Sequence, residues 1–243
     1  IKNDITRLTP ASFEPTIDYV VVKVPRWAFE KFPTADRTLT TQMKSVGEAM
    51  AIGRTFKEAF LKAFRSLELG RSGRLFGQTA PGQPYEGEDD AALQRALGVP
   101  TDRRMWAVFR AFERGWPLEE VRRLTKMDPW FLTQFQQMTE LMREVQAVGA
   151  RDLSAPLLRE VKRAGFSDAD LAVVLGVDED SIRARRQEHG LASAYKRIDT
   201  CAAEFESFTP YMYGTYEDEC ESDPTPKAKV VILGSGPNRI GQG

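Results

Sequence analysis

Apolar residues recur along the middle of this chain with the spacing of a helix face. From Phe131 to Val148 they are separated by three or four positions, and side chains at that spacing form one stripe of an α-helix. Asp128 precedes Pro129, a pair that favours a helix start because the carboxylate accepts a free amide and proline suits the first turn. The pattern predicts a long helix from about residue 129 to Gly149, with its stripe in a helical core.

Further helices are predicted on both sides of this one, so that residues 89–191 are nearly all helical. Thr55 and Glu58 form a capping-box pattern before an apolar stripe at helical spacing, which predicts a helix from residue 55. Shorter helices are expected over residues 102–114, 117–126, 155–164, 168–175 and 179–188. Gly165, Gly176 and Gly190 stand at three of the predicted ends, as C-terminal caps do. The short connections predict that consecutive helices are neighbours.

Strand-like patterns lie near both ends of the chain. Residues 18–24 are rich in valine and stop at Pro25, which has no amide for a strand ladder. Residues 45–52 form a second candidate strand, with Gly47 inside it. Val230–Leu233 is an unbroken apolar run, which is typical of a strand buried on both faces of a parallel sheet.

A glycine-rich loop follows this last strand and is the clearest candidate for binding chemistry, since bare amides in such a loop can face phosphate. Its candidate cofactor-binding residues are Gly234, Gly236, Asn238, Arg239 and Gly241. A dinucleotide fingerprint needs glycine at position 239, and a Walker loop needs lysine at position 242, which is glutamine here. The loop is therefore predicted to be an incomplete site, and a structural turn without a ligand remains the alternative.

The charge balance argues against nucleic acid or membrane as partners. Lys and Arg total 34 against 35 for Asp and Glu, and a net charge of −1 gives no long-range attraction for polyanions. No apolar stretch reaches the roughly 18 residues that a membrane span needs. Cys201 and Cys220 are too few and too far apart for a zinc motif or a disulfide framework. They are expected to be free thiols of a cytoplasmic protein.

Residues 166–190 favour a different function, because their rhythm is that of a helix-turn-helix. Arg183, Arg185 and Arg186 lie in the second predicted helix, where such motifs contact DNA. Five acidic residues surround them and would repel phosphate. A DNA-binding regulator is thus the alternative hypothesis.

Other charged residues have a structural interpretation. Lys44, Glu48 and Arg54 lie in or beside the second candidate strand and are expected to form ion pairs at a domain junction, with a substrate contact as the alternative. Residues 217–223 are mostly acidic, which predicts a solvated linker. Residues 70–88 are rich in glycine and proline, which predicts a long loop. The sequence contains no recognisable Ser/His/Asp set or metal-ligand cluster.

Several long strings are similar to the large subunit of carbamoyl-phosphate synthase, and they occur in the order of that family. The strings are Leu8–Trp27, Thr41–Thr55, Tyr195–Phe205, Tyr211–Tyr213, Thr215–Glu217 and Gly234–Gly243. The resemblance covers essentially the whole chain and is weaker between about residues 71 and 194. It implies that the 243 residues are a piece of a larger protein.

In that family, two homologous ATP-using halves are joined by a helical oligomerization domain. One half makes carboxyphosphate from bicarbonate, which ammonia converts to carbamate, and the other phosphorylates carbamate. The resemblance implies that residues 1–54 are the tail of the first half, 55–200 the helical domain, and 201–243 a linker and the opening strand and loop of the second half. The implied fold is mainly α, flanked by short β segments of two incomplete ATP-grasp-type α/β halves.

The family uses ATP with Mg²⁺ or Mn²⁺, bound by a Glu-x-Asn-x-Arg constellation that is absent from this sequence. The resemblance therefore implies no catalytic or metal-binding residue, no cofactor bound by this chain, and no activity of the chain alone. The implied partners are the rest of the large subunit, a small glutaminase subunit and further copies of the chain. Gly47, Ala49 and Ala51 are expected to line the internal route of carbamate, because their side chains are small. The sequence leaves open the arginine or pyrimidine pathway.

Overall fold

The computed structural model describes residues 1–70, 75–76, 84–85 and 87–234. This part of the chain is mainly helical, with four short strands in two antiparallel sheets. Its helices are α1 (Phe56–Ser66), α2 (Asp90–Gly98), α3 (Arg104–Glu113), α4 (Leu118–Thr125), α5 (Pro129–Val148), α6 (Ala155–Arg163), α7 (Asp168–Leu175) and α8 (Glu179–Glu188). Its strands are β1 (Val20–Arg26), β2 (Gly47–Gly53), β3 (Ala194–Arg197) and β4 (Met212–Thr215). The mainly α fold with flanking β segments is confirmed.

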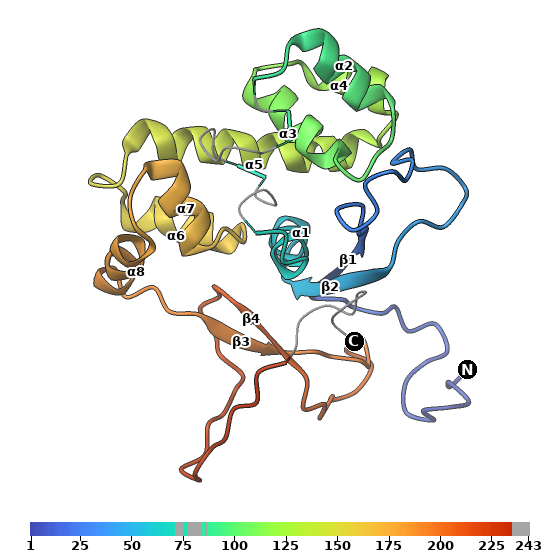
Figure 1. Cartoon of the computed structure of the whole chain (residues 1–243). Helices are drawn as coiled ribbons and strands as arrows, with labels where there is room; N and C mark the ends of the chain where they lie inside the picture. The colour runs from blue at the N-terminus through green and yellow to red at the C-terminus, as the bar shows by residue number, and fades with distance from the viewer. Residues whose placement is uncertain (71–74, 77–83, 86, 235–243) are drawn as a thin grey trace.

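The first sheet pairs β1 with β2, and α1 lies on one of its faces (Figure 1). Val20 stands opposite Gly53 and Arg26 opposite Gly47. Side chains alternate between the two faces of a strand, and in β2 the alternate residues Ala49 and Ala51 are buried. Both predicted strands are confirmed, with each observed strand shifted by about two residues toward the C-terminus.

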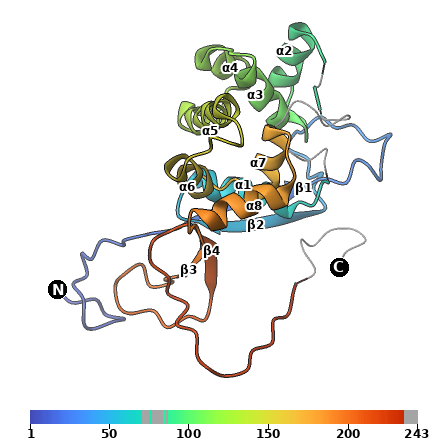
Figure 2. The same cartoon turned by 90° about the vertical axis from the view of Figure 1, so that its left-hand side faces the viewer.

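The helices α1–α8 form the helical body, and α5 runs through it. Helices α2, α3 and α4 lie toward one end of α5, and α6, α7 and α8 lie toward the other (Figures 1 and 2). The predicted helices are confirmed, and α2 adds one inside the region expected to be helical. The Asp128 carboxylate accepts a hydrogen bond from the Trp130 amide at 2.8 Å, as expected of an N-cap. The start of α5 is therefore encoded by residues next to it in the sequence.

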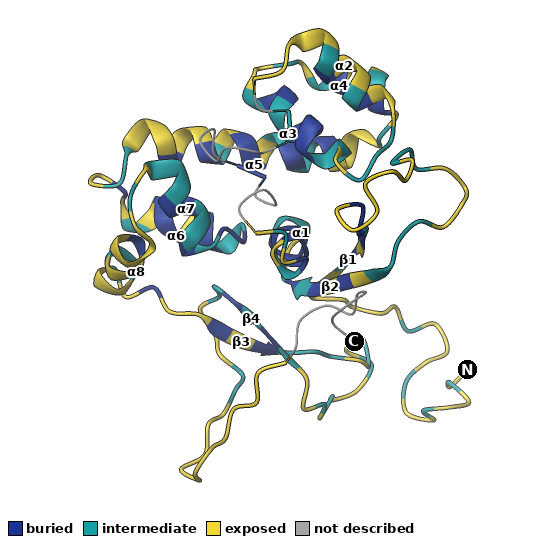
Figure 3. Cartoon of the chain, in the orientation of Figure 1, coloured by how far each residue is buried: buried dark blue, intermediate teal, exposed yellow. Residues whose placement is uncertain are grey.

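The core is rich in phenylalanine and lies between α1, α3 and α5, whose ribbons carry buried stretches in Figure 3. Phe109 of α3 is fully buried, and its ring centroid lies 5.4 Å from that of Phe135 on α5. Phe76 comes from the predicted loop 70–88, which lies largely outside the described residues. Its ring packs between Phe109 and Phe166, with centroid distances of 4.8 and 5.0 Å. Residue 76 thus belongs to the core.

The turn after α6 brings that helix very close to α1. Gly165 has a φ of +99°, and a Cβ built on it would lie 2.6 Å from the Cα of Glu58. Only glycine satisfies both the positive φ and this distance. Gly176, after α7, has a similar φ of +67° but open space around it.

Gly165→Ala is therefore expected to destabilise the chain by more than Gly176→Ala does. The left-handed backbone alone costs an alanine about 1–2 kcal/mol, and position 165 adds a backbone clash with α1. The measurement is the urea midpoint of unfolding for both variants. Equal midpoints would mean that α1 and α6 are not in close contact.

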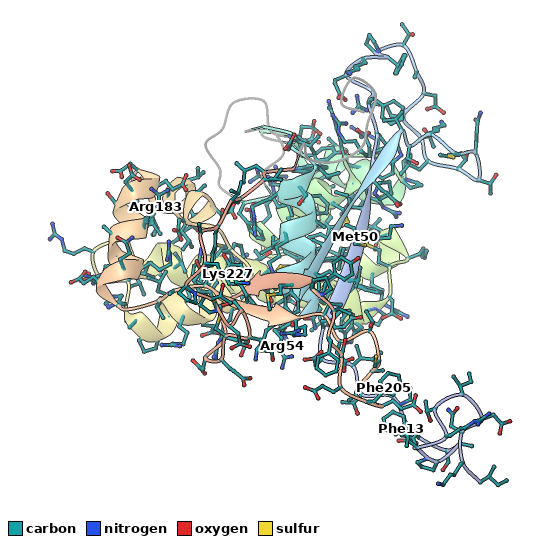
Figure 4. The ribbon with its side chains drawn as sticks, turned by 90° about the horizontal axis from the view of Figure 1, so that it is seen from below. Phe13, Met50, Arg54, Arg183, Phe205 and Lys227 are labelled. Carbon is teal, nitrogen blue, oxygen red and sulfur yellow. The ribbon has the colours of Figure 1, made fainter. Side chains whose placement is uncertain are left out.

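The second sheet, β3 with β4, lies below α1 and the first sheet in Figure 1. Its buried residues Ala194 and Tyr213 lie outside the main apolar cluster. The N-terminal segment lies against the loop before β4, since the Thr16 amide donates to the carbonyl of Ala202 at 2.9 Å. Phe13 and Phe205 both lie in this projecting arm (Figure 4).

The prediction of a buried strand over Val230–Leu233 is wrong for this structure. These residues form no ladder, and each is at least 81% exposed. A strand buried on both faces needs neighbouring strands and covering helices, and the described residues supply none at this segment. The apolar run remains a feature of sequence alone.

Candidate functional site

The predicted carbamate-route residues lie on β2 and are largely part of the core. Ala49 is 3% exposed and Ala51 8% exposed, and both belong to the apolar cluster that includes α1. Gly47 is half-buried at the start of the strand. Small side chains allow α1 to pack closely on β2, so close packing alone accounts for them. Their part in a route stays a prediction.

The glycine loop is not brought into a site within the described residues. Gly234 has no atom within 4 Å of a Cβ built on it. Gly236, Asn238, Arg239 and Gly241 lie outside the described residues. The candidate phosphate contacts of this loop therefore stay a prediction as well.

A groove of about 1140 Å³ lies between β1, α1, α3 and the start of α5. Its walls include the aromatic side chains of Trp27, Phe56, Phe60, Phe64, Trp106 and Trp130. An ion pair stands beside it, with the Arg37 Nε donating to Asp102 Oδ1 at 2.9 Å. The walls can cover an apolar surface, but they present no arrangement of nucleophile and base. Sequence reasoning missed this groove, because its walls come from four separate elements.

The segment 166–190 does form two helices joined at Gly176, but its arginines are held within the protein. Arg183 pairs with Asp180 at 2.6 Å and lies at the outer edge of the molecule (Figure 4). Arg185 donates to the Arg151 carbonyl at 3.0 Å, and Arg186 pairs with Asp168 at 3.1 Å. Such contacts favour helix packing as the reason for this motif, and nothing supports DNA binding.

A buried charge cluster, formed by Lys162, Asp168 and Arg186, joins α6, α7 and α8. The Lys162 ammonium lies 2.8 Å from Asp168, and both side chains are at most 10% exposed. The ring of Tyr216 faces both cations, with its centroid 4.9 Å from Lys162 Nζ and 5.9 Å from the guanidinium of Arg186. Burial raises the pKa of Asp168, but hydrogen bonds and attraction from the two cations outweigh this and lower it below its usual value.

The acidic segment after β4 is exposed at Asp218 and Glu219, yet it is also tied to α6 and β3 by ion pairs. Arg163 donates to the Tyr216 carbonyl at 2.9 Å and pairs with Asp218 at 2.9 Å. Lys196 of β3 pairs with Glu219 at 2.6 Å and with Glu221 at 3.2 Å. Side-chain charge therefore fastens residues 216–221 to the body of the protein.

A second polar cluster, the α1 junction, consists of Arg54, Glu58, Lys62, Gly165 and Gly214. Glu58 is 2% exposed and accepts a hydrogen bond from the Arg54 amide at 2.7 Å. Thr55 caps α1 as predicted, through its hydroxyl and the Glu58 amide, but the glutamate reaches the amide one residue earlier than the capping box requires. The signal for this cluster was a Glu–Lys pair four residues apart beside an apolar stripe.

The three charged residues predicted near the domain junction each form a separate ion pair. Lys44 pairs with Asp36 at 3.1 Å, Lys23 with Glu48 at 2.5 Å, and Arg54 with Asp18 at 2.8 Å. These pairs link loops and strands, as a structural interpretation requires.

Within residues 1–70, 75–76, 84–85 and 87–234, no three His, Cys, Asp or Glu side chains gather as a metal site would need. The two cysteines are free thiols. Over the same residues, no helix combines the length and apolar character of a membrane span.

Comparisons with known proteins all point to one protein family. A family model described as the carbamoyl-phosphate synthetase large chain, oligomerisation domain, matches residues 48–190. Over its full length the chain is 54% identical to the carbamoyl phosphate synthase large chain of Myxococcus xanthus and 52% identical to that of Pseudomonas aeruginosa. It is 51% identical to the arginine-specific large chain, chloroplastic, of Oryza sativa subsp. japonica.

The chain spans 22% of the length of the two bacterial relatives and 20% of the rice relative. The matched residues 48–190 begin in β2 and end just after α8, so they include the whole helical body. The chain therefore belongs to the family of carbamoyl-phosphate synthetase large chains, and its helical body is the oligomerisation domain of that family.

Proposed function

We propose that this chain is the structural connector of a carbamoyl-phosphate synthase large chain and performs no chemistry by itself. The observation that carries this is the position of α1, which contacts the first sheet while its Lys62 reaches β4 of the second. Under the domain boundaries predicted above, the first sheet belongs to the half that makes carboxyphosphate. The second sheet leads toward the half that phosphorylates carbamate. The helical body then holds the two halves in register.

The whole protein, on this proposal, makes carbamoyl phosphate in the cytoplasm from bicarbonate, ammonia and ATP. ATP and Mg²⁺ or Mn²⁺ would bind to the two catalytic halves outside these residues. A small glutaminase subunit would supply ammonia, and helix faces of the oligomerisation domain would contact further copies. The apolar groove beside β1 supports such contacts, since exposed apolar surfaces of this kind usually meet other protein. The product would serve arginine or pyrimidine synthesis.

A domain exchange tests the proposal. Residues 48–190 of this chain replace the matching segment of the Myxococcus xanthus large chain, with deletion of the segment as the matched control. The exchanged protein is expected to form carbamoyl phosphate and the deleted one to form none. A folded exchange protein without product would contradict the connector function.

The 243-residue chain alone is expected to form no carbamoyl phosphate from bicarbonate, ammonia, ATP and Mg²⁺. The reason is chemical, because phosphoryl transfer needs metal ions and cationic groups placed around the phosphates. ATP-dependent product formation by the purified chain would overturn this.

The 243-residue chain is also expected to assemble into a species larger than the monomer. Light scattering at increasing protein concentration measures this assembly.

The predicted carbamate route along Gly47, Ala49 and Ala51 belongs to the same proposal. It is supported by the small size of these residues and by their place on the strand of the first half that packs on α1. A bulky residue at Ala51 in the intact protein is expected to lower the yield of carbamoyl phosphate per ATP consumed.

A further inference from the structure

The side chain of Lys62, in the α1 junction, contacts both sheets. Its ammonium donates to the carbonyl of Ile52 in β2 at 3.0 Å and to the carbonyl of Gly214 in β4. It also lies 2.7 Å from the Glu58 carboxylate. A lysine ammonium has three N–H donors, so each of them has a partner here.

Glu58 fixes the position of this ammonium. Its side chain is 2% exposed, and one carboxylate oxygen is held by the Arg54 amide while the other faces Lys62. The backbone of Gly165 lies against that of Glu58, so closely that a Cβ built on Gly165 would be 2.6 Å from the Glu58 Cα. The carboxylate is thus held at both of its oxygens, and it keeps the ammonium within reach of both carbonyls.

The second sheet depends on such polar contacts. Its buried residues Ala194 and Tyr213 lie outside the main apolar cluster, and among the described residues it forms no strand ladder with the first sheet. Lys62 also faces the ring of Tyr213 in β4, whose centroid lies 5.6 Å from the ammonium. A further contact comes from Arg163, which donates to the carbonyl of Tyr216 just after β4. A two-stranded sheet has only marginal stability alone. The position of β4 is therefore determined by the side chains that bind it.

We propose that Lys62 is a positioning residue that couples the two catalytic halves by holding the ends of β2 and β4 at one ammonium group. A shift of β2 moves Lys62, and Lys62 carries the Gly214 carbonyl with it. This inference rests on the proposed connector function, because only there do β2 and β4 belong to different halves.

Hydrogen exchange on the 243-residue chain tests the contact itself. Lys62→Met removes the donors and keeps the length of the side chain, and it is expected to speed exchange of the β3 and β4 amides about tenfold or more. Exchange in α3 and α5 stays as in the parent chain. Lys57→Met is the matched control, since Lys57 is on the same helix and outside the junction. Unchanged exchange in β4 overturns the proposal.

If Lys62→Met unfolds the chain, the double variant Glu58→Gln/Lys62→Met takes its place. It leaves no unpaired buried charge, and the same increase in β4 exchange is expected. A double variant that folds with parental exchange in β4 also overturns the proposal.

In the intact large chain, the ratio of ATP consumed to carbamoyl phosphate formed separates coupling from a purely structural role, which would leave this ratio unchanged. Lys62→Met is expected to raise the ATP consumed per carbamoyl phosphate formed, while Lys57→Met leaves that ratio unchanged. An unaltered ratio in a protein that makes product overturns the coupling and leaves the connector function standing. Failure of the parent protein to make any carbamoyl phosphate overturns the function instead.

Discussion

Phe109→Ala lowers the free energy of unfolding by about 3–5 kcal/mol, because it empties the centre of the core. Phe109 is fully buried on α3, and its ring meets rings from α1 and α5 at centroid distances of 6.1 and 5.4 Å. It also meets Phe76 at 4.8 Å. The loss is large against the roughly 5–15 kcal/mol that stabilise a typical domain.

Urea denaturation followed by circular dichroism measures this loss. The matched control is Phe208→Ala, which removes the same ring from a position that is 76% exposed. That change is expected to stay within about 0.5 kcal/mol of the parent chain. Equal losses at the two positions would contradict the core assignment.

Asp168→Ala is expected to lower the free energy of unfolding by about 3–5 kcal/mol, since it leaves the buried Lys162 and the half-buried Arg186 without a counter-charge. The Lys162 side chain is 4% exposed and that of Arg186 is 17% exposed. The control is Asp180→Ala, whose partner Arg183 is exposed. An exposed ion pair of this kind contributes about 0.2–1 kcal/mol. A loss of that small size at Asp168 would show that the cluster is solvated.

The charge cluster of Lys162, Asp168 and Arg186 also makes the stability of the chain depend on pH. The pKa of Asp168 is lower in the folded chain than its ordinary value of 3.8. The stabilisation is therefore complete above about pH 4 and is lost as the pH falls through the lower folded pKa. Unfolding measured between about pH 2 and pH 7 should show a steeper acid loss in the parent chain than in Asp168→Asn.

Sequence patterns predicted the helices because their signals are local. The Asp128 cap and the apolar stripe of α5 lie within twenty residues, and Gly165 and Gly176 mark helix ends with positive φ. The strand predicted at Val230–Leu233 failed for the opposite reason, since a strand depends on partners that the run itself does not specify. Burial of an apolar run is a property of its neighbours.

The candidate sites were harder to predict because they join distant segments. Lys62 and Gly214 are 152 positions apart, and Arg185 and Arg186 contact residues of other segments, Arg151 and Asp168. The helix-turn-helix rhythm and the three arginines suggested DNA contact there, because the sequence does not show which partners the arginines have in the fold. The family resemblance identified the protein class, but contacts between elements revealed the α1 junction.

Helix α5 determines how the two clusters of helices at its ends face each other. Its 20 residues form a strut of about 30 Å. Each residue of an α-helix adds about 1.5 Å along the axis and rotates the following chain by about 100° around it. One inserted residue would therefore swing α6, α7 and α8 to a different side of α2, α3 and α4, so the length of this single rod determines the relative orientation of the two ends.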